Sequence, residues 1–286
     1  MYKNLMLAFG AVLSLTGCVS EVSEFIGESE PAHISQAENL EGTENLKVQV
    51  NLGLGSLEVT RGDAEKLFDL DIDYDGKNDK PKIRFTRDGS SALLRIELEG
   101  KKGSGWLQED NRITLELSPE VELAACFVTG VGENQVDLTG LKVGSLEVVN
   151  GVGHAEIHMD EVNRAKCGPV KVTNGIGHLE MTGIGNYGFS DFAFTGGIGD
   201  STLDYSGTWD VIGDIEIKVG LGSLEVDIPE ELGVRIRTSK SFLSNIQMPG
   251  FSQVGNEYLS GNIDETEKKI VISLNTGIGG VSFVHR

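Results

Sequence analysis

The 286-residue sequence is poor in cysteine, in aromatic residues and in positive charge. It has three cysteines, and its 24 lysines and arginines are outnumbered by 44 aspartates and glutamates, which gives a net charge of −20. Nucleic acid and anionic lipid surfaces repel so acidic a chain, so we expect no nucleic-acid partner. A hydrophobic content of 39% nevertheless argues against disorder. The length allows one large core or a solenoid.

Long hydrophobic runs are also scarce. The longest, Leu5–Leu15, follows Lys3 and is too short to span a bilayer. A basic start, a short apolar run and small residues predict a signal peptide over residues 1–17. Leu15-Thr16-Gly17-Cys18 resembles a bacterial lipobox, so we expect Cys18 to be lipidated and to anchor the chain to the cell envelope. Val19 stands where aspartate would resemble an inner-membrane retention signal, which favours the outer membrane in a Gram-negative host.

The signatures of common enzymes are missing. The glycine-rich phrases lead into strands, so no helix N-terminus is available to hold a phosphate. The sequence contains no GxSxG elbow and no metalloprotease signature, and its five histidines are scattered. We therefore expect a protein that is not an enzyme and has no cofactor. A lyase or glycosidase with an acidic cleft stays open as a less favoured alternative.

What the sequence does contain is a repeated glycine–apolar–glycine phrase followed by alternating residues. From Gly130 to Gly220 the phrases begin 21, 24, 22 and 23 residues apart. Such a period indicates a solenoid, in which stacked coils bury one another's apolar edges. An alternating segment lies on each side of a phrase, which predicts strands, and helix signals are almost absent. The phrases begin at Gly53, Gly130, Gly151, Gly175, Gly197, Gly220 and Gly277.

The composition divides the chain into three parts. After the signal peptide, residues 18–45 hold the lipidation site and an acidic, flexible tether. Residues 46–286 are expected to form an all-β, single-stranded β-helix. It begins with an antiparallel hairpin region in which Asp75-Gly76 and Asp88-Gly89 are the turns and 112–117 is a further strand. A hairpin-like insertion is expected between Val234 and Leu274.

Stacking in register would place equivalent residues in columns. Residues equivalent to Leu57 and Val59 should point inward, and the alternate residues should face solvent. Asn134 and Ser201 break the inward pattern, and the sequence offers no account of them.

One outward column carries candidate metal ligands. Imidazole and carboxylate groups together suit zinc or another transition metal, so a divalent cation is one interpretation. A hydrophilic face that keeps the solenoid soluble is the favoured one. The candidate ligands are His154 beside His178, Glu133 and Asp200 on their flanks, and Glu156 beside Glu180.

Two smaller features leave alternatives open. Asp71, Asp73 and Asp75 open a loop that resembles an EF-hand, but Lys82 occupies the place of the bidentate glutamate, so a polar strand followed by a turn is favoured. Cys126 and Cys167 lie in different columns and on coils two apart, about 9.6 Å at ordinary strand spacing. Two unpaired residues are therefore favoured over a disulfide.

The GxG phrases, the acidic strand ending in DYDG and the terminal TGIGGVSF resemble the toastrack family over residues 46–286. This family is related to the carboxy-terminal domain of LiaF-type envelope proteins and to adhesin-type domains of bacterial surfaces. The resemblance implies a membrane-associated β-helix without known catalysis. The expected function is a lipid-anchored structural or adhesin-like module that meets an envelope protein or polysaccharide. An envelope-stress signalling accessory is the alternative, although LiaF-type proteins resemble multi-pass membrane proteins.

Overall fold

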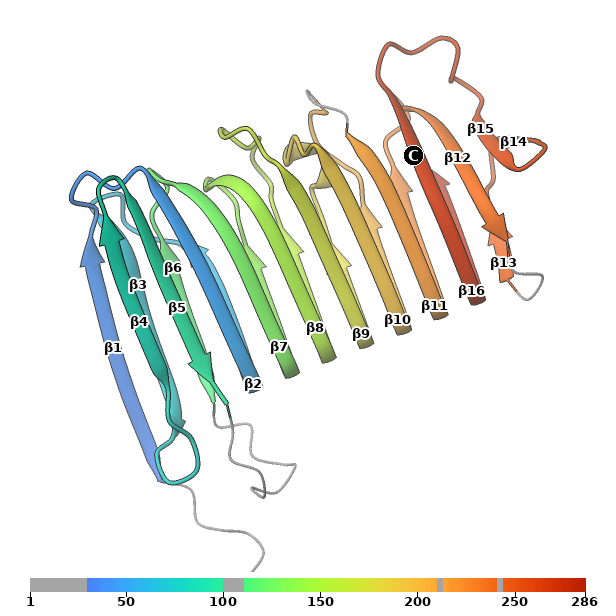
Figure 1. Ribbon diagram of the computed structural model, residues 1–286. Helices are drawn as coiled ribbons and strands as arrows, with labels where there is room; N and C mark the ends of the chain where they lie inside the picture. The colour runs from blue at the N-terminus through green and yellow to red at the C-terminus, as the bar shows by residue number, and fades with distance from the viewer. Residues whose placement is uncertain (1–29, 100–110, 210–212, 241–243) are drawn as a thin grey trace, which may run out of the picture.

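The computed structural model describes residues 30–99, 111–209, 213–240 and 244–286. In this part of the chain the fold is all-β: sixteen strands form one continuous hydrogen-bonded sheet, and a three-residue 3-10 helix, η1 (Ile184–Asn186), is the one helical element. Figure 1 shows the strands standing in a row, like the bars of a rack. The expected β-solenoid is therefore confirmed.

The body of the molecule consists of seven long strands, each with a GxG phrase near its middle. The phrase divides each strand into a first and a second arm. In Figure 1 the bends lie along one edge and the connecting loops along the other, and we call these the bend edge and the loop edge. The seven are β2 (Asn45–Arg61), β7 (Glu122–Asp137), β8 (Lys142–His158), β9 (Pro169–Met181), β10 (Asp191–Asp204), β11 (Asp214–Ile228) and β16 (Lys269–His285).

The seven strands pair in parallel with their glycines in register. The second glycine of each phrase pairs with its equivalent on the next strand, and all seven have φ between +129° and +146°. A Cβ on Gly177 would lie 2.0 Å from the carbonyl oxygen of Gly153, so no other residue fits this bend. The glycines concerned are Gly55, Gly132, Gly153, Gly177, Gly199, Gly222 and Gly279.

The core lies between the first and second arms. In β8, Leu146 and Val148 come from the first arm and Ala155 and Ile157 from the second, and all four are at most 1% exposed. The alternate residues of both arms face outward. This is the inward and outward division that the strand period predicts.

The polar residues that break the inward pattern form a buried ladder just inside the bends. Asn134 donates from Nδ2 to Asn150 Oδ1 (3.0 Å), and Asn150 donates in the same way to Asn174 (2.9 Å). Thr129 donates to Asn134 Oδ1 (2.5 Å), and Asn174 donates to the Gly177 carbonyl (3.3 Å). The buried amides therefore satisfy one another's hydrogen bonds, at positions where the neighbouring strand β2 has the buried apolar residues Leu52 and Leu57. Ser201 is also buried, and no described contact explains it.

The amino-terminal end differs from the expected meander. The Asp88-Gly89 turn joins a true antiparallel pair, β4 (Lys82–Asp88) and β5 (Ser91–Leu98). Asp75-Gly76 instead leads from β3 (Lys66–Asp75) to β4, two strands that do not pair: β3 lies between β1 (Pro31–Asn39) and β6 (Arg112–Leu117). β5 extends the first-arm sheet beside β2, and β6 extends the second-arm sheet.

Strand β1 also corrects the expected tether, because ordered structure begins before residue 46. β1 pairs with β3 from Pro31↔Asp75 to Asn39↔Lys66. Cys18 and residues 1–29 lie outside the described residues.

The carboxyl-terminal end holds more than the expected hairpin insertion. The hairpin consists of β14 (Phe251–Val254) and β15 (Glu257–Ser260). β12 (Gly233–Lys240) and β13 (Ser244–Gln247) pair in parallel with the two arms of β16 and form one more coil. The last GxG strand, β16, is therefore inserted between β11 and this earlier coil.

Candidate interaction surfaces

The described surface offers several candidate sites, among them a shallow hollow near the carboxyl-terminal end. No helix among the described residues is long and apolar enough to cross a membrane. Within the same residues, no group of three or more His, Cys, Asp or Glu side chains is arranged to hold a metal ion.

The histidine and carboxylate columns lie on the outer face of the second arms. The register pairs His154 with His178, and Glu156 with Glu180. The two imidazole rings stack at a centroid distance of 5.1 Å with 6° between their planes. The same register places Glu133 beside His154 and Asp200 beside His178.

Hydrogen bonds along the strand, rather than a shared central point, organise these side chains. His154 Nε2 lies 2.8 Å from Glu156 Oε1, and His158 Nε2 lies 3.8 Å from Glu156 Oε2. The hydrogen bond from His154 is the main cause that holds the pKa of Glu156 below its usual range. His158 Nδ1 lies 2.9 Å from Thr182 Oγ1. The column is a connected polar surface, and zinc binding by its residues stays a prediction.

The EF-hand-like aspartates are divided between two environments. His33 on β1 lies 3.2 Å from Asp71 and 2.8 Å from Asp73, on an exposed strand face. Asp75 is buried and accepts hydrogen bonds from the Glu30 amide (3.1 Å) and the Lys77 amide (3.0 Å). The hydrogen bond from the Glu30 amide is the main cause that holds the pKa of Asp75 below its usual range. Asp71 and Asp73 thus belong to an exposed strand face, and Asp75 belongs to a turn.

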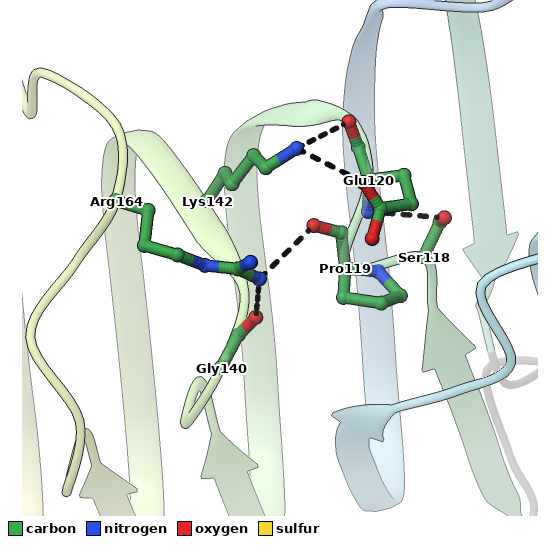
Figure 2. A network of polar contacts seen from close by, with 6 residues as sticks. All are labelled: Ser118, Pro119, Glu120, Gly140, Lys142 and Arg164. Carbon is green, nitrogen blue, oxygen red and sulfur yellow. Dashed lines mark hydrogen bonds and ion pairs between the residues drawn. The ribbon is translucent and has the colours of Figure 1, made fainter.

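The loop edge is joined across coils by basic side chains (Figure 2). Arg164 donates to the carbonyls of Gly140 (2.9 Å) and Pro119 (3.4 Å), which belong to two preceding loops. Lys142 donates to the Glu120 carbonyl (2.9 Å) and lies 3.3 Å from its carboxylate. These cations satisfy loop carbonyls and are committed to structure rather than to a ligand.

A shallow hollow of about 280 Å³ lies near the carboxyl-terminal end of the second-arm face. Its polar lining includes Asp200, Glu225, Asn245 and Gln247. Ser223 donates to Asp200 across the β10–β11 pair. The sequence analysis did not predict Asn245 and Gln247 at this site. They belong to β13, which carries no GxG phrase, so the repeat does not predict that β13 pairs with β16.

The two described cysteines are free thiols. Burial raises the pKa of Cys167 to about 12, and Cys126 also has a raised pKa because of burial and the nearby Glu147. Neither thiol is activated for nucleophilic chemistry at neutral pH.

Comparison with known proteins identifies the family of the chain. A putative cell adhesion protein from Clostridium sporogenes is similar to it, with 17% identity, a TM-score of 0.45, and coverage of 90% of this chain and 100% of that one. A putative adhesin from Parabacteroides distasonis has 14% identity, a TM-score of 0.40, and coverage of 90% and 98%. Among curated proteins no match was found. The family described as the "N-terminal domain of toast_rack, DUF2154" matches residues 26–182, more than half of the sequence. The chain therefore belongs to the toast_rack family.

Proposed function

We propose that this protein is a lipid-anchored component of the bacterial cell envelope that acts as a structural or adhesin-like interaction module without catalytic activity. The observation that carries the proposal is the stack of seven bent strands in parallel register, whose arms present long rows of outward polar side chains. Stacked repeats of this kind provide extended binding surfaces. Membership of the toast_rack family and the lipobox around Cys18 support the same role.

The partner is an envelope protein or polysaccharide that meets an outer face. The net charge of −20 favours a basic or neutral partner over an anionic one. For a polysaccharide, the hollow with Asp200, Glu225, Asn245 and Gln247 offers carboxylate and amide groups that can bond sugar hydroxyls.

Anchoring is tested by the mass of the mature chain. The chain purified from its own envelope should begin at residue 18 and carry acyl groups, and Cys18→Ser should abolish both. A mature chain without acyl groups contradicts the anchored form.

The interaction role is tested by cross-linking in the intact envelope, followed by purification of the tagged chain. A specific protein or glycan should be recovered with the wild-type chain. Recovery of the chain alone contradicts an interaction module. Release of soluble fragments from envelope polysaccharide, lost in Glu225→Gln, would instead show that the protein is an enzyme.

A further inference from the structure

The bend edge carries a continuous row of exposed apolar side chains. The middle residue of each GxG phrase pairs with the middle residue of the next, so these side chains form one column across seven strands. At an ordinary strand spacing of about 4.8 Å the row is about 29 Å long. We call it the apolar ridge. It comprises Leu54, which is half-buried, and Val131, Val152, Ile176, Ile198, Leu221 and Ile278, which are 39–51% exposed.

The ridge protrudes from the edge of the molecule. Each of its residues has a glycine on both sides along the chain, so no neighbouring side chain on the same strand shields it. The exposed position is also costly, because each residue leaves apolar surface in water. A row of such residues marks a contact with another apolar surface.

Negative charge is absent from the outward column of the first arms that lies next to the ridge. Three residues before each ridge position, the outward column contains no aspartate or glutamate, although the chain has 44 acidic residues. The second-arm side carries Glu133 and Asp200, with His154 and His178 between them. The first-arm column is Asn51, Val128, Val149, Thr173, Thr195, Lys218 and Asn275.

The segment that follows Cys18 enters the described structure at this same edge. Strand β1 begins beside Asp75 at the bend edge (Figure 1), and the Glu30 amide donates to the Asp75 carboxylate (3.1 Å). Asn111 accepts from the Asp75 amide (3.4 Å) and donates to the carbonyl of Leu54, the first ridge residue (3.1 Å). Eleven residues separate Cys18 from Glu30, which span at most about 40 Å.

We propose that the apolar ridge rests on the phospholipid bilayer that holds the lipid anchor, with its side chains at the boundary between headgroups and acyl chains. This inference depends on the anchoring proposed above. The short connection starts on the ridge side of the domain, so the bilayer lies within reach of the ridge. The domain would then stand on its bend edge, with its loop edge and polar faces directed away from the membrane.

A bilayer fits the ridge better than a second copy of the chain does. Two narrow, protruding ridges would bury little area against each other, far below what a stable dimer needs. A bilayer surface can accept a protruding row of leucine, isoleucine and valine at shallow depth. The membrane should have little net charge, because the chain as a whole is acidic.

The test adds one tryptophan at either edge, and the fluorescence of the wild-type chain, which contains Trp106 and Trp209, is subtracted from that of each variant. The mature chain is purified from its own envelope and reconstituted in phosphatidylcholine vesicles, with or without bromine on the acyl chains. Ile176→Trp reports the ridge, and Val162→Trp, 46% exposed in the loop-edge segment after β8, is the matched control. Brominated lipid should quench the Ile176→Trp fluorescence and shift its emission to the blue, and it should leave Val162→Trp unchanged. Equal quenching of the two variants, or of neither, would overturn the proposal.

The mass of each purified chain separates this inference from the anchoring proposal. An acylated chain without quenching at residue 176 rejects the ridge contact and leaves the anchor standing. A chain without acyl groups that is still quenched rejects the anchor and leaves the ridge contact standing. A dimer in detergent that cross-links through residue 176, with no quenching in vesicles, shows that a second copy covers the ridge and overturns the bilayer contact. Hydrogen exchange of the wild-type chain, with and without vesicles, gives the same decision if a variant fails to fold.

Discussion

At the residue scale, Glu156 makes the histidine column sensitive to acid. Its bond to His154 lowers the pKa of the folded carboxyl below 4.5, its ordinary value, so the carboxylate stabilises the fold above that pH and stops doing so as the pH falls through the folded pKa. Solvent reaches the pair, so the effect is small.

Thermal melts from neutral pH to below pH 4.5 measure this contribution. Wild-type melting temperature should fall more steeply in the acid range than that of Glu156→Gln. Glu180→Gln is the matched control, because it occupies the register-equivalent position on β9 and no described histidine bonds its carboxylate. Parallel acid profiles for wild type and Glu156→Gln would show that the His154 bond adds no stability.

The asparagine ladder makes a stronger residue-scale prediction. Asn150 accepts from Asn134 and donates to Asn174, all of them buried. Asn150→Ala leaves both neighbours with an unsatisfied group, so the free energy of unfolding should fall by about 2 kcal/mol. Urea denaturation measures the loss. Val149→Ala, on the half-buried outward position next along β8, should lose less.

The sequence predicted which face of each strand a residue occupies, and it predicted the pairing of His154 with His178. The sequence could not predict the asparagine ladder, because Asn134 is only a polar residue at an inward position when its strand is considered alone. Its partner Asn150 lies before its own glycines, so the two amides meet only after the arms fold together.

At the scale of the single coil, the bend depends on the second glycine of the phrase. Gly177→Ala combines a φ of +131° with a Cβ 2.0 Å from the Gly153 carbonyl oxygen. It should destabilise the fold by about 3 kcal/mol, because strain and the broken contact with β8 act together. Gly280→Ala is the matched control, since a Cβ there meets nothing within 4 Å. The melting temperature of each variant checks the difference, and equal melts would reject a steric role for the glycine.

The strands themselves were predictable because a GxG phrase marks each of the long ones. Among the elements that lack a phrase, the strand at 112–117 and the Asp88-Gly89 hairpin were predicted, whereas strand β1 and the pairing of β3 were not. β1 reads as tether, since its only large apolar residue is Ile34 and its strand character comes from pairing with β3. Asp75-Gly76 has the sequence of a hairpin turn, but β3 joins the second arm of β2 through β6, and β4 joins the first arm of β2 through β5. The sequence predicts a turn at Asp75-Gly76 but does not predict with which strand β4 pairs.

At the scale of the whole molecule, a stack of coils must end without offering an open sheet edge. Here β4 covers the first-arm sheet and β1 covers the second-arm sheet at the amino-terminal end. Both carry charged residues, Arg84 and Arg87 on β4 and Glu38 on β1. The four-residue strands β13 and β14 leave only short edges at the other end. Charged or short edge strands of this kind disfavour edge-to-edge growth of the stack.

Removal of β1 should therefore convert the protein into one that associates. A full chain lacking residues 30–39 would expose the edge of β3, whose Leu70 and Ile72 are fully buried in the intact protein. The unpaired backbone and the loosened core should lower the melting temperature and produce higher oligomers in detergent, measured by sedimentation. A chain lacking residues 20–29 is the control, because it is shortened equally and keeps β1. If the variant without β1 sediments as a monomer with an unchanged melt, β1 is dispensable and another feature must prevent edge-to-edge growth.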